Sequence, residues 1–129
     1  MTPCMWLPGW PRTLNVLVVD GDRSRRERLA GDLQRRGFDV RVAVNPRGAS
    51  AAAKRRAFDV VVVSDGDPAP VVRGVRAVAP GARFVAIAQA PDIVGWIELG
   101  LLGVTEIVAR EATADEIAAA LGRFAPYAA

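Results

Sequence analysis

Short apolar runs alternate with amphipathic stretches along the whole chain. The apolar runs predict five strands, at 16–19, 38–44, 60–63, 83–88 and 106–109. Between and after them, apolar residues recur at helical spacing and predict five helices, at 23–36, 46–56, 71–78, 92–102 and 113–124. Strand and helix therefore alternate at intervals of about 20–25 residues, which is typical of βαβ units that form a parallel sheet with helices on both faces.

Two of the predicted strands differ in a way that indicates their place in the sheet. Residues 60–63 are four consecutive valines, apolar on both faces, as expected of a central strand. Residues 38–44 alternate strictly, with Val40, Val42 and Val44 expected on one side, as in a half-exposed edge strand. With a buried first strand, this pattern fits a flavodoxin-like (βα)5 doubly wound α/β fold with strand order 2-1-3-4-5.

The predicted helices carry cues for their ends and for their buried faces. Asp22 or Asp20 can cap the first helix, and Thr113 to Glu116 form a capping box at the start of the last. The fourth helix is expected to pack through the residues that share one side of it, namely Ile93, Trp96, Ile97, Gly100 and Leu101.

The 129 residues are enough for one domain with a substantial core. We expect a flexible leader at 1–13, one domain at 14–125 and a short tail at 126–129. Cys4 is the single cysteine, so an internal disulfide is excluded, and a reducing compartment, the cytoplasm, is expected. No apolar run approaches the length of a membrane span, and the leader does not resemble a signal peptide.

Charge is distributed unevenly, with 15 Arg and Lys against 8 Asp and Glu in residues 1–83, and 2 against 6 in residues 84–129. The arginines of the basic part fall on the polar faces of the predicted helices, so we expect no binding to nucleic acid and none to membranes. Histidine is absent, which excludes catalysis by histidine and most zinc sites.

Carboxylates follow two of the apolar strands, and neighbouring strands would bring them together. Asp20 and Asp22 follow the first strand, and Asp65 and Asp67 follow the third. Converging carboxylates repel one another and need a cation, for which Mg²⁺ or Arg110 is suited. With Mg²⁺ held by Asp20 and Asp65, Asp65 would be a candidate phosphoryl acceptor. Asp22 or Asp67 could complete the metal site, but the commoner role for such a residue is to cap the next helix.

Residues 14–124 resemble the response-regulator receiver family (CheY-like). The resemblance is carried by Val18–Asp20, by Val63–Asp65, by Gly103–Arg110 and by the capped last helix. It implies two-component signalling, in which a histidine kinase phosphorylates Asp65 with the help of Mg²⁺.

Several positions depart from the pattern that this family implies. Gly21 stands where receivers carry a second acid that binds magnesium, and Ala88 stands where they carry Ser or Thr. The family lysine becomes Arg110, the proline after it becomes Glu111, and the aromatic switch residue becomes Ile107. Ala88 cannot donate a hydrogen bond to a phosphoryl group. Arg110 can instead pair with Asp65 in a fixed salt bridge.

These departures indicate an atypical, stand-alone receiver that is not an enzyme and acts through protein–protein contacts, without normal phosphorylation switching. Its partner would be a histidine kinase or an output protein, or a second copy bound through the face of the fourth helix, fifth strand and fifth helix. Interface candidates there are Trp96, Glu98 and Glu106, although a tryptophan on an apolar helix face is more often buried. The alternative is a working phosphoacceptor at Asp65. A flavodoxin-like enzyme or cofactor binder fits less well, because the strand ends offer carboxylates and not a phosphate-binding loop.

Overall fold

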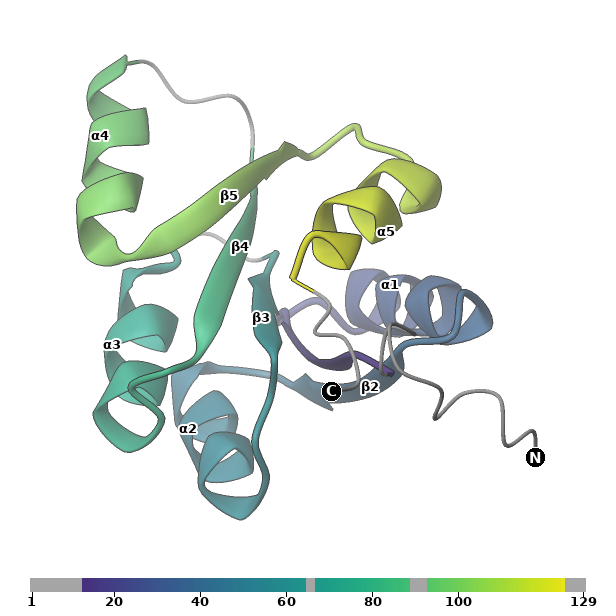
Figure 1. Cartoon of the computed structure of the whole chain (residues 1–129), viewed down its shortest axis with the longest axis horizontal. Helices are drawn as coiled ribbons and strands as arrows, with labels where there is room; N and C mark the ends of the chain where they lie inside the picture. The colour runs from purple at the N-terminus through teal and green to yellow at the C-terminus, as the bar shows by residue number, and fades with distance from the viewer. Residues whose placement is uncertain (1–12, 65–66, 89–92, 125–129) are drawn as a thin grey trace, which may run out of the picture.

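The structure is a computed structural model, and it describes residues 13–64, 67–88 and 93–124. Five strands alternate with five helices along the chain (Figure 1). In order, they are β1 (Asn15–Val19), α1 (Arg23–Arg35), β2 (Asp39–Ala43), α2 (Pro46–Arg55), β3 (Val60–Val63), α3 (Ala69–Val78), β4 (Arg83–Ala88), α4 (Ile93–Leu102), β5 (Val104–Ala109) and α5 (Ala114–Gly122). None of the helices in the described part of the chain is long and apolar enough to span a membrane.

All five strands are parallel and follow the order β2-β1-β3-β4-β5, which confirms the predicted fold. The valine strand β3 lies between β1 and β4, and all four of its side chains are buried. β2 forms one edge of the sheet, as its alternating pattern predicts.

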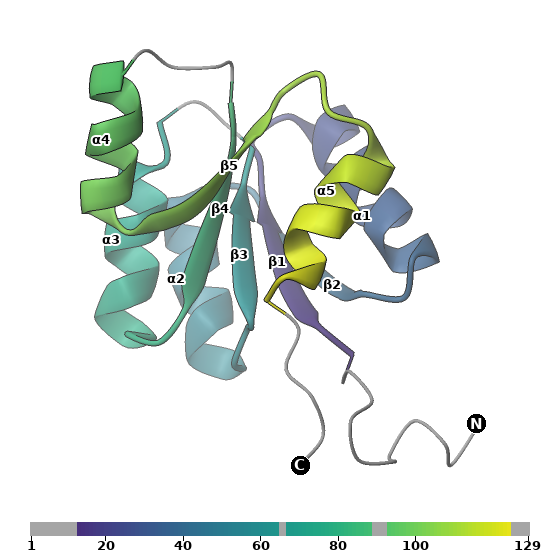
Figure 2. The ribbon, with the colours of Figure 1, turned by 45° about the horizontal axis from the view of Figure 1, so that its top comes forward.

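Helices cover both faces of the sheet, with α1 and α5 on one side and α2, α3 and α4 on the other (Figure 2). The side chains of β3 divide between the two layers because successive residues of a strand point to opposite faces. Val60 and Val62 pack in the cluster that includes Leu33 of α1 and Ile117 of α5. Val61 and Val63, together with the other side chains of the second cluster, pack on the face that α2 and α3 cover.

The expected buried face of β2 is wrong at its carboxyl end. Val40 is buried, but Val42 and Val44 are half exposed, and Ala43 is the buried residue there. The first half of α1 has the sequence RSRRER, which offers no apolar side chain to cover Val42. An edge strand also has a neighbouring strand on one side only.

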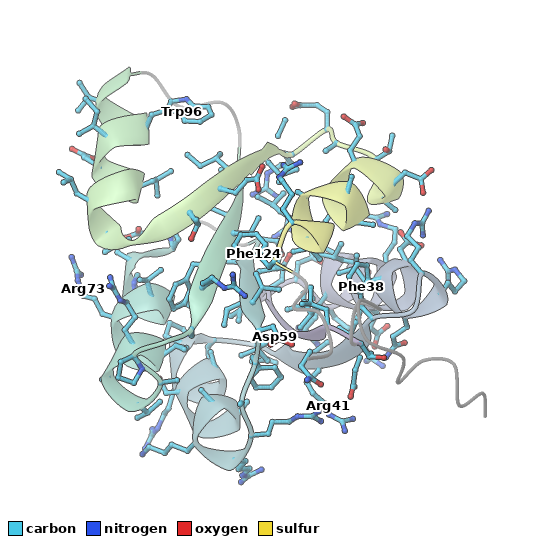
Figure 3. All side chains as sticks on the ribbon, in the orientation of Figure 1. Phe38, Arg41, Asp59, Arg73, Trp96 and Phe124 are labelled. Atoms are coloured by element: carbon cyan, nitrogen blue, oxygen red, sulfur yellow. The ribbon has the colours of Figure 1, made fainter. Side chains whose placement is uncertain are left out.

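The expected buried face of α4 is also wrong. Leu99 and Leu102 pack against the sheet, whereas Ile97 is exposed and Leu101 is 83% exposed. Trp96 is 50% exposed and projects from α4 in Figure 3. The helix sequence IVGWIELGLL is apolar on nearly every side, so residue spacing alone does not identify the face that packs.

The helix ends follow local sequence cues more closely. Thr113 and Glu116 form the predicted capping box, with reciprocal hydrogen bonds of 3.2 and 3.1 Å between side chains and backbone N–H groups. β5 begins at Val104, two residues before the predicted start. The proposed leader and tail lie outside the described residues, apart from Thr13, so the division of the chain at 13 and 125 stays a prediction.

Candidate functional site

The carboxyl ends of β1 and β3 lie side by side and place Asp20 next to Ser64. The strand register pairs Val19 with Val63, one residue before each of them. Asp20 is fully buried and Ser64 is almost fully buried. Asp65, the candidate phosphoacceptor and metal ligand, lies outside the described residues, so its predicted role stays a prediction.

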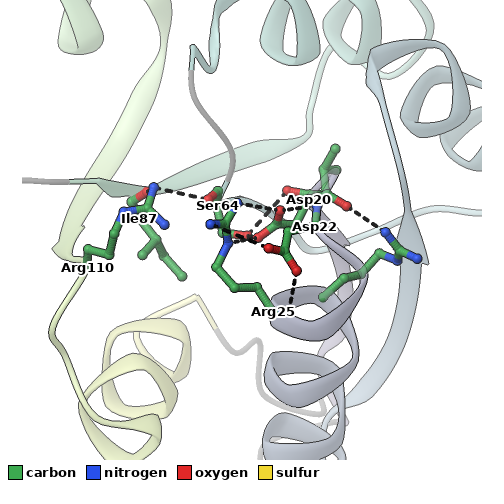
Figure 4. Close-up of polar contacts among 8 residues, drawn as sticks. Asp20, Asp22, Arg25, Ser64, Ile87 and Arg110 are labelled. Carbon is green, nitrogen blue, oxygen red and sulfur yellow. Dashed lines mark hydrogen bonds and ion pairs between the residues drawn. The ribbon is translucent and has the colours of Figure 1, made fainter.

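The Asp20 carboxylate is enclosed by hydrogen-bond donors (Figure 4). Arg25 binds it with two prongs, Nε to Oδ2 at 2.9 Å and Nη2 to Oδ1 at 3.0 Å. The Ser64 hydroxyl donates to Oδ2 at 2.6 Å, and the backbone N–H of Asp22 donates to Oδ1 at 2.8 Å. Each oxygen therefore accepts two hydrogen bonds, which fills the four acceptor positions of a carboxylate.

The first turn of α1 holds this arrangement in place. Asp22 caps the helix by accepting a hydrogen bond from the backbone N–H of Arg25 at 3.1 Å. Arg26 Nη1 donates to the main-chain carbonyl of Asp20 at 2.9 Å. Because side chains on a helix tilt toward its N-terminus, Arg25 reaches back over the end of β1.

Sequence reasoning missed Arg25, which it treated as a residue of a polar helix face. One local signal could have identified it, namely an arginine three residues after the helix cap and five residues after a strand-terminal aspartate. The predicted cation, Arg110, contacts main-chain carbonyls of the same site. Its Nη2 donates to the main-chain carbonyls of Ser64 at 3.2 Å and Ile87 at 3.4 Å. The predicted pairing of Arg110 with Asp65 lies outside the described residues.

Opposing effects act on the acidity of Asp20. Burial by itself raises the pKa of this carboxyl group, because it penalises the charged form. The hydrogen bonds from Arg25, Ser64 and the Asp22 N–H favour the charged form and outweigh burial, so the pKa of Asp20 is held below its ordinary value of 3.8. Asp20 is therefore ionised at neutral pH.

The lowered pKa predicts a dependence of stability on pH. A depressed folded-state pKa gives stability that is complete above the unfolded pKa, about 3.9, and that is lost as pH falls through the folded pKa. In urea unfolding between pH 7 and pH 2.5, we expect wild-type protein to lose more stability below pH 4 than the Asp20→Asn variant does. Asp32→Asn, which removes a half-buried carboxylate that is paired with Arg35 farther along α1, is the control. Equal losses in wild type and Asp20→Asn would contradict the prediction.

Asp22 and Asp67 both act at helix starts. Asp22 caps α1, and Asp67 Oδ1 accepts a hydrogen bond from the N–H of Ala69 at 3.0 Å, at the first residue of α3. The described residues contain no group of three or more His, Cys, Asp or Glu side chains placed to hold a metal. In this arrangement both Asp20 oxygens are occupied by hydrogen-bond donors, and Asp65, the other predicted Mg²⁺ ligand, lies outside the described residues.

The other predicted positions lie in the turn after β1, at the end of β4, on β5 and on α4. Gly21 is exposed in the turn after β1, and Ala88 is half buried at the end of β4. Ile107 is half buried and packs against the second cluster. Glu98 is exposed on α4, whereas Glu106 is paired with Arg123 beyond α5.

The chain is similar to known proteins both in sequence and in structure. No family model matches the sequence. The chain is 31% identical over 111 residues to the acid tolerance regulatory protein ActR of Rhizobium meliloti, which covers 83% of the chain and 57% of ActR. The chain therefore spans little more than half the length of that relative.

Solved structures share the fold over nearly the same part of the chain. The chemotaxis protein CheY4 of Vibrio cholerae matches with a TM-score of 0.79 and 23% identity, covering 87% of the chain and 98% of CheY4. A response regulator from Burkholderia pseudomallei, described with a phosphorylated aspartic acid, a calcium ion and citrate, matches with a TM-score of 0.74 and 26% identity, covering 84% of the chain and 66% of that protein. With its 2-1-3-4-5 sheet and its strand-end Asp20, the chain has the fold of the CheY-like receiver domains of response regulators, and its sequence is similar to that of the regulatory protein ActR.

Proposed function

We propose that this chain is an atypical receiver, a protein-interaction module of a signalling pathway that works without aspartyl phosphorylation as its switch. The observation that carries the proposal is the two-pronged pairing of Arg25 with the fully buried Asp20. Arg25 supplies this carboxylate with a positive charge from within the chain, which is the task a divalent cation would otherwise perform.

The cost of displacing Arg25 supports this proposal. For Mg²⁺ to bind Asp20, at least one oxygen must give up a charge-assisted hydrogen bond, and such bonds are about twice as strong as neutral ones. Arg25 is tethered to α1 and is therefore always present at high local concentration, whereas the ion must be taken from solution and must lose part of its water shell. We infer that the pocket keeps its charge balance without metal.

Two further positions favour a module that is not switched by phosphate. Ala88 at the end of β4 has no hydroxyl to donate to a phosphoryl group. Ile107 packs against apolar side chains and lacks the polar group with which a tyrosine can report a change of state. Neither side chain can form a hydrogen bond with a phosphoryl group placed near Asp20.

The partner face of this module is proposed to be α4 with β5 and α5. Trp96 and Leu101 expose large apolar surfaces on α4, and Glu98 adds a negative charge beside them. A homodimer through this face, an output protein or a histidine kinase is the proposed partner. We expect no nucleic acid or membrane partner and no enzymatic activity.

The alternative is a working phosphoacceptor, with Asp65 phosphorylated by a histidine kinase and Mg²⁺ held by Asp20 and Asp65 with Asp22 or Asp67. The phosphorylated aspartic acid and calcium ion described for the Burkholderia pseudomallei protein support this alternative.

Titration with Mg²⁺, followed by incubation with acetyl phosphate and measurement of intact mass, separates the two functions. We expect no saturable change in tryptophan fluorescence, no phosphoryl mass increment, and the same solution mass with and without the phosphodonor. Circular dichroism shows that the protein is folded in each sample. A phosphoryl increment that disappears in Asp65→Asn would overturn the proposal and establish the alternative.

A further inference from the structure

A cavity of about 240 Å³ opens between α1 and α5, beside the Asp20–Arg25 pair. These two helices lie next to each other on one face of the sheet in Figures 1 and 2. The cavity also reaches the ends of β3, β4 and β5 through Ser64, Ile87 and Arg110. Because Asp20, Arg25 and Ser64 also line it, the cavity includes part of the receiver site and extends away from it along the helices.

One part of the cavity wall is apolar. Leu29 of α1, Ile87 of β4 and Ile117 of α5 contribute branched side chains. Ala112 and Ala114, at the start of α5, line the same space, and their single methyl groups leave it open. A ligand with a small apolar body would gain by removing this surface from water.

The other part of the wall carries more positive charge than its own carboxylates offset. Asp20 is neutralised by Arg25, and Asp32 is paired with Arg35. Arg28 forms no ion pair with the described residues, and Arg110 contacts main-chain carbonyls at 3.2 and 3.4 Å. Two guanidinium groups therefore line the cavity without a carboxylate partner among the described residues, which favours an anion.

We propose that this cavity binds a small organic anion, with its charged group between Arg28 and Arg110 and its apolar body against Leu29, Ile87 and Ile117. The volume equals that of about eight water molecules at roughly 30 Å³ each, which fits a compound with a single ring. It is below the range of about 300–1,000 Å³ that is usual for larger ligands, which favours a small compound over a nucleotide. The charged group is a carboxylate or a phosphate ester, because guanidinium groups bind both.

Such a ligand would connect α1 to the start of α5. Since α1 also carries Arg25, a bound anion would stabilise the helix that neutralises Asp20. The site would provide an input to the receiver that needs no phosphorylation. This role rests on the proposed function, whereas the binding itself does not.

Nuclear magnetic resonance titration of the full chain tests the binding, with benzoate and phenyl phosphate as probes and neutral benzamide as the matched control. We expect saturable shifts of Leu29, Ile87 and Ile117 with at least one anion, and at least tenfold weaker binding of benzamide. The stronger of the two anions identifies the charged group. Equal affinity for benzoate and benzamide, or no saturation with either anion below about 10 mM, would overturn the proposal.

Variants of the cavity wall separate this site from nonspecific binding. Arg28→Gln and Arg110→Gln are each expected to weaken binding about tenfold, the equivalent of one lost charge-assisted hydrogen bond. Ala114→Leu is expected to abolish binding by filling the space. Arg41→Gln, on the exposed edge strand β2, is the matched control and leaves affinity unchanged. The assignment would be contradicted if binding were unchanged in Arg28→Gln, Arg110→Gln and Ala114→Leu. The outcome of this test does not affect the Mg²⁺ and acetyl phosphate experiment, so the two proposals can fail separately.

Discussion

Replacement of Arg25 by alanine is expected to lower the free energy of unfolding by about 3 kcal/mol in metal-free buffer. The variant leaves the fully buried Asp20 carboxylate without its counterion, and breaking a buried ion pair in this way costs about 3–5 kcal/mol. Arg25 is 39% exposed, which places the expected loss at the lower end of that range. Urea denaturation at pH 7 measures it.

Mg²⁺ is expected to restore part of the lost stability in the Arg25→Ala variant but not to change wild-type protein. Removal of the guanidinium frees one acceptor position on each Asp20 oxygen for a cation. A ligand that binds only the folded state stabilises it by mass action. At a Mg²⁺ concentration ten times Kd, the gain is about 1.4 kcal/mol. Ca²⁺ in place of Mg²⁺ shows whether the freed site is selective.

Arg23→Ala is the matched control for this experiment. Arg23 lies on the same first turn of α1 but pairs with Glu27 on the exposed surface. Its loss is expected to change stability by less than about 0.5 kcal/mol and to leave Mg²⁺ without effect. If Arg25→Ala and Arg23→Ala are equally stable, Arg25 does not provide the charge balance of the pocket.

A second large effect is expected for Leu33→Ala, at about 3–4 kcal/mol. Leu33 is fully buried between α1 and the sheet, and α1 has few other apolar side chains with which to pack. The substitution removes buried methyl groups and leaves a cavity. In a domain of this size the loss corresponds to a fall in Tm of about 10 °C.

Leu29→Ala is the control for Leu33→Ala on the same helix. Leu29 is half buried, so its truncation is expected to cost about 1 kcal/mol. Hydrogen exchange should show faster exchange throughout α1 in Leu33→Ala, because the helix is attached mainly through that residue. Equal losses in the two variants would show that α1 is held by its polar contacts instead.

The Asp20–Arg25 pair also connects the site with the stability of α1. The first turn of this helix carries the cap Asp22, the pocket arginine Arg25, and Arg26, which binds the end of β1. Unfolding of this first turn would therefore expose Asp20. In turn, the ionised form of Asp20 stabilises the folded turn. We infer that the receiver site and α1 form one cooperative unit.

The sequence by itself determined the architecture of this protein. Alternating strands and helices indicated a parallel sheet, and the four valines of β3 together with the alternating pattern of β2 indicated strand order 2-1-3-4-5. The capping box of Thr113 and Glu116 was also readable, because both partners lie within one helical turn. These features depend on period, burial and local hydrogen bonding, which a linear sequence contains directly.

Only the tertiary structure decided which cation neutralises Asp20 and which side of α4 is buried. From the sequence, Mg²⁺ or Arg110 was expected as the cation, whereas Arg25 pairs with Asp20 because the first turn of α1 is oriented over the end of β1. In α4, apolar residues surround the helix, so its contact through Leu99 and Leu102 depends on where the neighbouring elements lie. Side-chain pairing across a turn and packing between separate elements are set by three-dimensional placement, which residue spacing does not specify.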